Sequence, residues 1–208
     1  MKKILLLLSL IPFYLQAETQ QLAWEQLKPE VKTETVTLPS VNDSQKKLLA
    51  QVLQLQYQND KSSQDEQKKI IDTLKSQGID AKKALDARER FMASEQLKAE
   101  TLNHKIDGKT VRMPGFIVPI EFDGLKGTDF LLVPYAGACI HLPPPPANQI
   151  VRISYPQGFE VENIQYPVWV EGKIKAEKQT EDVYLVDGKT KLTMGYKMEG
   201  DLIERYYE

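Results

Sequence analysis

The sequence has little of the chemistry that most catalytic or metal-binding proteins use. Its 208 residues contain one cysteine and two histidines. A single cysteine excludes an intramolecular disulfide, and two histidines exclude any metal site that needs three of them. The 27 Lys and Arg side chains nearly balance the 29 Asp and Glu side chains, whereas a general nucleic-acid-binding protein would show a basic surface. Because no complete catalytic signature is present, the sequence says more about location and architecture than about activity.

Long apolar runs are also absent, apart from one near the N-terminus. Lysines at positions 2 and 3 precede the mostly apolar segment from Ile4 to Leu15, and Ala17 is a small residue at the expected cleavage point. The run is shorter than the roughly 20 residues that a membrane span needs, and the pattern is typical of a cleaved secretory signal. We predict that residues 1–17 are a signal peptide, and that the mature chain begins at Glu18 in the bacterial periplasm without a membrane span.

Residues 18–100 are nearly free of glycine and proline, and this predicts a helical N-terminal region. Gly78 is their single glycine, and apolar side chains recur at the three- and four-residue spacing of amphipathic helices. Residues 41–44 and Asp80 are candidate N-caps, and Gly78 is expected to end a helix. The polar stretch Asp60 to Gln64 is expected to be a loop.

Residues 101–208 change to patterns that are typical of strands. Asp-Gly pairs are hairpin turn signals, and the clearest is Asp187-Gly188. The segment from Val168 to Lys175 alternates, which predicts a half-buried strand, and the apolar run from Phe130 to Val133 predicts a strand buried on both faces. We predict an α+β fold in which the helical region precedes a small antiparallel β-barrel or sheet. A five-stranded OB-like barrel fits the strand count, and an open α+β sheet is the alternative.

The stretch from Pro134 to Gln149 contains the sole cysteine, Cys139, two residues before His141. On a strand the two side chains would share a face, with Cα atoms about 6.6 Å apart. Both could then reach one zinc ion, but two protein ligands make only half a site. The remaining ligands would come from a partner chain or from His104, Glu121, Asp123 or Asp129.

The same residues allow two other interpretations. Cys139 could be a small buried side chain beside a hydrogen-bonded His141. It could instead be a nucleophile with His141 as its base and Asn148 or Gln149 as a donor. The four prolines that follow are expected to form either a rigid polyproline II wall or a ridge that docks a partner. They are Pro143, Pro144, Pro145 and Pro146.

The pattern Gly-Ala-Cys-Ile-His-x-Pro-Pro-Pro-Pro-Ala-Asn-Gln, at residues 137–149, resembles the signature of a bacterial family of exported proteins that is classed as a domain of unknown function. The resemblance includes the segment from Arg112 to Pro119, and it extends to the N-terminus through the segment from Trp24 to Pro29. It implies a periplasmic or envelope protein that is associated with ABC-class transporter components and with zinc homeostasis.

We therefore expect a periplasmic, non-enzymatic accessory or binding protein that works with a component of an envelope ABC transporter. Zinc is the candidate metal, with Cys139, His141 and His104 as candidate ligands. The alternative is an envelope enzyme that uses Cys139 as a nucleophile or redox thiol. Residues 101–208 would form the β-rich domain that carries this chemistry.

Overall fold

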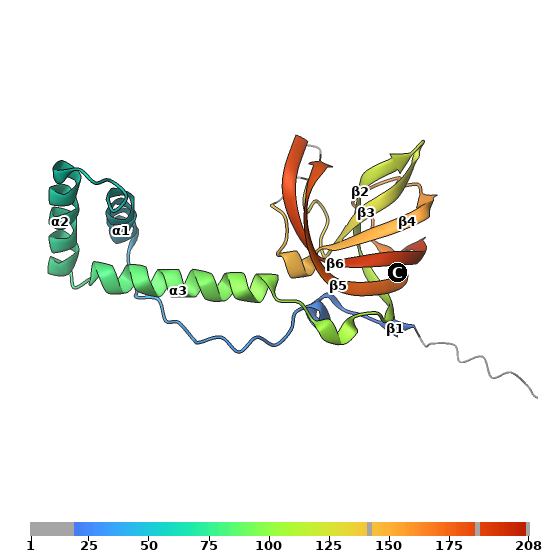
Figure 1. Cartoon of the computed structure of the whole chain (residues 1–208), viewed down its shortest axis with the longest axis horizontal. Helices are drawn as coiled ribbons and strands as arrows, with labels where there is room; N and C mark the ends of the chain where they lie inside the picture. Colours follow the sequence, from blue (N-terminus) through green and yellow to red (C-terminus); the bar gives the residue numbers. More distant parts are fainter. Residues whose placement is uncertain (1–18, 141–142, 186–187, 207–208) are drawn as a thin grey trace, which may run out of the picture. The chain divides into compact units, whose positions relative to one another are not determined.

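The computed structural model describes residues 19–140, 143–185 and 188–206, and they form two units (Figure 1). The sheet unit comprises residues 19–27, 103–140, 143–145, 149–185 and 188–206. The helical unit comprises residues 28–102 and 146–148. The expected signal peptide, residues 1–17, lies outside the described residues. In the part of the chain that the structure describes, no helix is long and apolar enough to cross a membrane.

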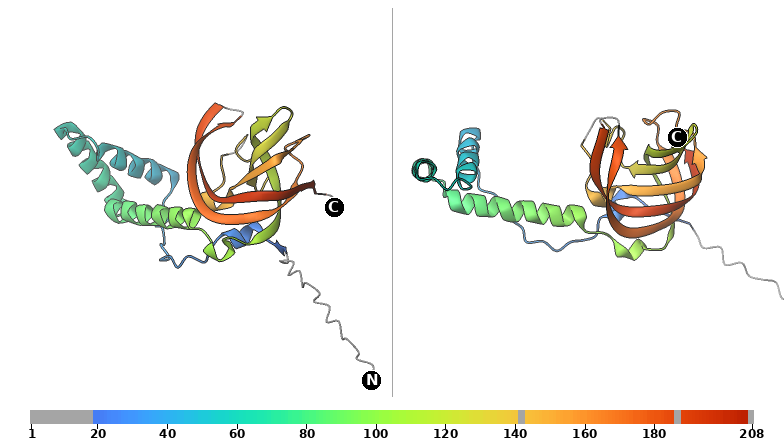
Figure 2. Two further views of the ribbon diagram at one scale, coloured as in Figure 1. Left: turned by 45° about the vertical axis from the view of Figure 1, so that its right-hand side comes forward. Right: turned by 45° about the horizontal axis from the view of Figure 1, so that its top comes forward.

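The sheet unit contains a ring of hydrogen-bonded strands, whose long curved members are visible in Figure 2. The sheet has the order β1-β2-β3-β4-β6-β5, and β2 also pairs with β5, so the pairing closes from β2 through β3, β4, β6 and β5. The strands are β1 (Gln20–Gln21), β2 (Thr110–Asp123), β3 (Lys126–Val133), β4 (Val151–Phe159), β5 (Val168–Leu185) and β6 (Gly188–Arg205).

The chain combines helices and a sheet, as predicted, but the expectation of a purely antiparallel sheet is wrong. β4 pairs with β6 in parallel, and the short β1 pairs with β2 in parallel. The remaining neighbours are antiparallel. The parallel pair arises because β5 lies between β4 and β6 in the sequence, so the chain returns to β4 running in the same direction.

Two of the three Asp-Gly pairs lie between antiparallel strands that are neighbours in the sheet, as predicted for hairpins. β2 and β3 are joined by a tight turn in which Gly124 has a φ of 62°, a left-handed value that glycine adopts without strain. β5 and β6 pair as far as Leu185 and Gly188, as expected, although residues 186–187 lie outside the described residues. The Asp-Gly pair at 107–108 precedes β2 and does not join two strands.

Two predicted strands also show the expected burial. The side chains from Phe130 to Val133 have no exposed surface, so this part of β3 is buried on both faces. In β5, Val168, Val170 and Ile174 are buried, with more exposed residues between them. This alternation follows from the two-residue period of a strand, which turns successive side chains to opposite faces.

The helical unit contains three helices whose caps match the sequence. Asn42 caps the first helix in a reciprocal capping box with Gln45. Asp80 caps the third by accepting a hydrogen bond from Lys83 N at 3.0 Å. Gly78, with a φ of 80°, follows the second helix. The helices are α1 (Asp43–Leu55), α2 (Lys61–Ser76) and α3 (Ala81–Glu100).

The prediction of a loop from Asp60 to Gln64 is wrong, because α2 begins inside this stretch. Asp60 is its N-cap, and its carboxylate accepts hydrogen bonds from Ser63 N at 2.9 Å and from Ser63 Oγ at 2.6 Å. The first turn of a helix can be polar when a cap satisfies its N–H groups. A missing apolar period therefore does not exclude a helix start.

Candidate functional site

Cys139 does not lie on a strand, which corrects the geometry expected for the Cys139–His141 pair. β3 ends at Val133, and the chain then turns, with Ile140 N donating to Gly137 O at 3.2 Å. Cys139 has a φ of 63°, a left-handed value that is uncommon for a residue with a side chain. His141 lies outside the described residues, so the expected pairing stays a prediction.

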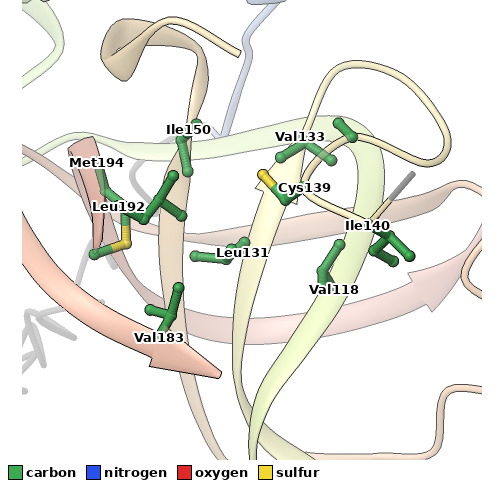
Figure 3. Packing of buried hydrophobic residues seen from close by; sticks show 10 residues of the cluster. Val118, Leu131, Val133, Cys139, Ile140, Ile150, Val183, Leu192 and Met194 are labelled. Carbon is green, nitrogen blue, oxygen red and sulfur yellow. The ribbon is translucent and has the colours of Figure 1, made fainter. Parts of the chain in front are cut away.

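The thiol of Cys139 is buried among apolar side chains, as Figure 3 shows. Cys139 is 5% exposed and belongs to a cluster with Val118 of β2 and with Leu131 and Val133 of β3. Burial raises the pKa of this thiol from 9.0 to about 11. At pH 7 a thiol with that pKa is ionised in roughly one molecule in ten thousand. In this environment the thiol of Cys139 is neutral in nearly every molecule, whereas nucleophiles and metal ligands are thiolates.

The other candidate zinc ligands do not complete a shell around this thiol. His104 is exposed in a short 3-10 helix (His104–Ile106). Glu121 and Asp129 contact the guanidinium of Arg152 at 3.6 and 3.2 Å. Within residues 19–140, 143–185 and 188–206, no group of three His, Cys, Asp or Glu side chains is placed to hold a metal ion. The described residues around the thiol therefore do not fit a zinc site by themselves.

Arg152 pairs with several carboxylates of the sheet unit, which the sequence analysis did not foresee. It also pairs with Glu181, so that one guanidinium on β4 contacts three acidic side chains. Burial raises the pKa of Asp129, and the nearby Arg152 opposes that rise. Arg152 thus compensates the negative charge of the partly buried Asp129 carboxylate. Arg152 and its three acidic partners form an ion-pair network.

Asn148 and Gln149, the last two residues of the signature, bind main-chain carbonyls. Asn148 is 1% exposed, and its Nδ2 donates to Lys98 O at 2.7 Å and to Thr101 O at 3.1 Å. The last carbonyls of a helix have no partner within the helix, so Asn148 caps the end of α3. Gln149 is 4% exposed, and its Nε2 donates to Trp24 O at 3.0 Å. Both amides hold the fold together.

Hydrogen bonds also hold the opening segment from Trp24 to Leu27 against the sheet. The indole Nε1 of Trp24 donates to Pro114 O at 2.8 Å. The hydroxyl of Tyr196, a residue 1% exposed, donates to Leu27 O and accepts from Asn103 N, each at 2.6 Å. No local pattern marks Tyr196, because these partners lie 169 and 93 residues away in the sequence.

The three stretches that carry the family resemblance therefore meet in space. The N-terminal stretch supplies Trp24, the second supplies Pro114 and the third supplies Gln149, joined by the hydrogen bonds above. Of the four prolines, Pro145 is buried and the other three are exposed. Their role as a wall or docking ridge stays a prediction.

Comparison with known proteins identifies a family for this chain. The family model described as "Protein of unknown function (DUF3299)" matches residues 24–205. The crystal structure of a DUF3299 family protein, PA4066 from Pseudomonas aeruginosa PAO1, is similar with a TM-score of 0.52 and 25% sequence identity, over 91% of this chain and 97% of that chain. The comparison with curated proteins gives no match. Because the family match spans most of its length, the chain belongs to the DUF3299 family.

Proposed function

We propose that this chain is a periplasmic, non-enzymatic accessory protein that works with an ABC-class transporter component of the bacterial envelope. The observation that carries the proposal is the use of the signature residues. Gln149 and Asn148 bind main-chain carbonyls, and Cys139 packs in an apolar cluster. Because these signature residues make contacts within the fold, we infer that other residues, on the surface of the protein, recognise the partner.

The cellular setting in this proposal rests on the sequence. The lysine pair and apolar segment at the N-terminus support export, and the family resemblance supports the association with a transporter. We also infer that the strand ring is the OB-like barrel that the strand count suggests, because five strands close on one another through the β2–β5 pair. Such a ring is a rigid scaffold for presenting surfaces to a partner.

The enzymatic alternative is less well supported by the surroundings of Cys139. A catalytic cysteine needs a thiolate that a nearby base or positive charge stabilises. Burial instead raises the pKa of the Cys139 thiol to about 11. The two amides considered as donors already bind the carbonyls of Trp24 and Lys98.

Zinc binding is a second candidate function, and the spacing of Cys139 and His141 favours it. The thiol would have to leave its apolar cluster or lose its proton to the metal, and zinc binding does deprotonate its ligands. Because Glu121 and Asp129 contact Arg152, water or a partner chain would complete the shell.

The accessory role can be tested by crosslinking the native chain in intact cells and purifying it from solubilised envelopes. We expect a component of an ABC transporter to be recovered with the wild-type chain, and equally with a Cys139→Ala variant. Recovery without any transporter component would contradict the accessory role. Loss of the component in a folded Cys139→Ala variant would favour a function that needs the thiol.

A further inference from the structure

The first described residues of the sheet unit come from a distant part of the sequence. Residues 19–27 belong to this unit, but residues 28–102, which belong to the helical unit, separate them from the rest of it. The five strands that close on one another all lie between Thr110 and Arg205. The ring is therefore complete without residues 19–27, which are called the N-terminal segment below.

The N-terminal segment binds the ring as an added strand. β1 pairs in parallel with Val111 and Arg112 of β2 (Figure 1), and Leu22 N then donates to Arg112 O at 2.9 Å. β3 pairs with β2 from Phe116 onwards, so the earlier part of this edge of β2 accepts β1 instead. Adding a strand to a sheet is one of the ways in which proteins bind an extended peptide, with main-chain hydrogen bonds for affinity and pockets for specificity.

Three large apolar side chains anchor the N-terminal segment. Leu22, Trp24 and Leu27 are 2%, 9% and 0% exposed, whereas the neighbouring Gln21 and Glu25 are exposed. The buried residues form a Leu-x-Trp-x-x-Leu pattern. Large apolar anchors separated by exposed positions are the means by which a binding groove distinguishes one peptide from another.

Hydrogen bonds to other parts of the sheet unit fix the polar groups of the N-terminal segment. The indole Nε1 of Trp24 donates to Pro114 O at 2.8 Å, and Trp24 O accepts from Gln149 Nε2 at 3.0 Å. At the end of the segment, Leu27 O accepts from the hydroxyl of Tyr196 at 2.6 Å. A separate peptide with the same sequence could make each of these contacts, because none of them uses the connection to residue 28.

The chain leaves the sheet unit and returns to it at one point. The hydroxyl of Tyr196 lies 2.6 Å from Leu27 O and also 2.6 Å from Asn103 N. The side-chain Nδ2 of Asn103 donates to Gln26 O at 2.6 Å. Residues 28–102 are therefore a tether whose two ends are held by the sheet unit itself. A cut within this tether leaves all of these contacts in place.

We propose that the N-terminal segment is an exchangeable strand, and that the ring also binds the same segment from a second copy of the chain. Exchange of an identical element needs no new contacts, because the incoming segment repeats the pairing with β2 and the three apolar anchors. In the intact chain the tether keeps the local concentration of the segment at about millimolar, so free copies compete poorly. The inference goes beyond the proposed accessory role, because it assigns to the ring a binding site for a segment with the Leu-x-Trp-x-x-Leu pattern.

The test uses residues 18–208 with a protease recognition sequence inserted after Lys32, an exposed residue outside the helices and strands. After cleavage, the N-terminal fragment should stay with the rest of the chain in size-exclusion chromatography under native conditions. A fluorescent peptide of residues 18–29 should then bind the cleaved chain in fluorescence anisotropy. The uncleaved chain should need at least about a hundredfold more peptide to reach the same occupancy.

Variants of the peptide test the anchors while the chain itself stays unchanged. Trp24→Ala in the peptide removes the indole and its hydrogen bond to Pro114 O, and it should weaken binding to the cleaved chain by at least about tenfold. Glu25→Ala replaces an exposed side chain and should leave binding unchanged. In the cleaved chain, Gln149→Ala should speed release of the fragment by about tenfold, because Trp24 O loses its donor.

Exchange between copies of the chain has its own measurement. Two cleaved samples, one of them labelled with nitrogen-15, are mixed and examined by native mass spectrometry. We expect labelled fragments to appear on unlabelled chains, and unlabelled fragments on labelled chains. Samples whose fragments never mix would show that the segment does not pass between copies.

Three further outcomes would overturn the inference. The first is loss of cooperative unfolding on cleavage, followed by the fluorescence of Trp169 in β5, because the ring would then need the covalent connection. The second is a cleaved chain that takes up no peptide at about millimolar concentration. The third is equal binding of the Trp24→Ala peptide and the wild-type peptide, because the anchors would then select nothing.

Discussion

The side-chain amide of Gln149 donates a hydrogen bond to the main-chain carbonyl of Trp24 at 3.0 Å, across 125 residues of sequence. It joins the end of the proline-rich signature to the start of the family match at residue 24. Because Gln149 is only 4% exposed, water cannot readily replace the bond if the amide is removed. The signature therefore contributes to stability in a way that can be measured.

Replacing Gln149 by Ala should destabilise the chain by about 1–3 kcal/mol, because the carbonyl of Trp24 loses a buried donor. Thermal unfolding should show a midpoint lower by about 2–4 °C for each kcal/mol. Gln165→Ala, at an exposed position of the same unit, is the matched control and should change the midpoint little. Equal midpoints for Gln149→Ala and the wild type would contradict a structural role for the signature amide.

The burial of Cys139 predicts a loss of stability at alkaline pH. Burial raises the pKa of its thiol from 9.0 to about 11, so the unfolded chain ionises this group at a lower pH than the folded chain does. The stabilisation is complete below about pH 9 and is lost as the pH rises toward 11. Over that range the free energy of unfolding should fall by about 2–3 kcal/mol more in the wild type than in Cys139→Ala.

Denaturant titrations of both proteins at several alkaline pH values measure this difference. Burial also raises the pKa of Tyr196, but the two proteins share that group, so the comparison isolates the thiol. At neutral pH the thiol of the folded wild type should react slowly with an aromatic disulfide reagent, and unfolding should accelerate the reaction. A fast reaction in the folded protein would show that Cys139 is an accessible thiolate.

The zinc hypothesis predicts binding that depends on both Cys139 and His141. Calorimetric titration of zinc at neutral pH should give weaker or no binding for Cys139→Ser and for His141→Ala. Near pH 5 the wild type should also bind more weakly, because an imidazole with an ordinary pKa of about 6.5 is protonated there. If all three proteins titrate alike, or if none binds more tightly than roughly millimolar, zinc is not a ligand of this pair.

The export hypothesis predicts that the mature chain begins at Glu18. The intact mass of protein recovered from the periplasmic fraction should correspond to residues 18–208, because Ala17 provides the small residue that signal peptidases accept. An Ala17→Trp variant should retain the segment at residues 1–17. A wild-type mass that includes those residues would contradict cleavage.

Local features of the chain were determined by the sequence alone. Asn42 and Asp80 cap their helices, Gly124 turns a hairpin, and the apolar run from Phe130 to Val133 is fully buried. Each of these depends on the conformational preference or hydrogen bonding of a few neighbouring residues, and such preferences act over short distances. The polar start of α2 was missed because one capping carboxylate outweighs the lack of an apolar pattern.

Only the tertiary structure decided the site. The ring closes through the β2–β5 pair, and β4 pairs with β6 in parallel. Both features depend on which strands become neighbours in the folded chain. The same holds for two contacts at the site. A turn places Cys139 in an apolar cluster, and Gln149 pairs with Trp24, but the local sequence around these residues does not indicate either contact. Cys139 and Gln149 have the residue types of a reactive site in the sequence, but the tertiary structure buries both of them against distant parts of the chain, because burial depends on which segments pack together.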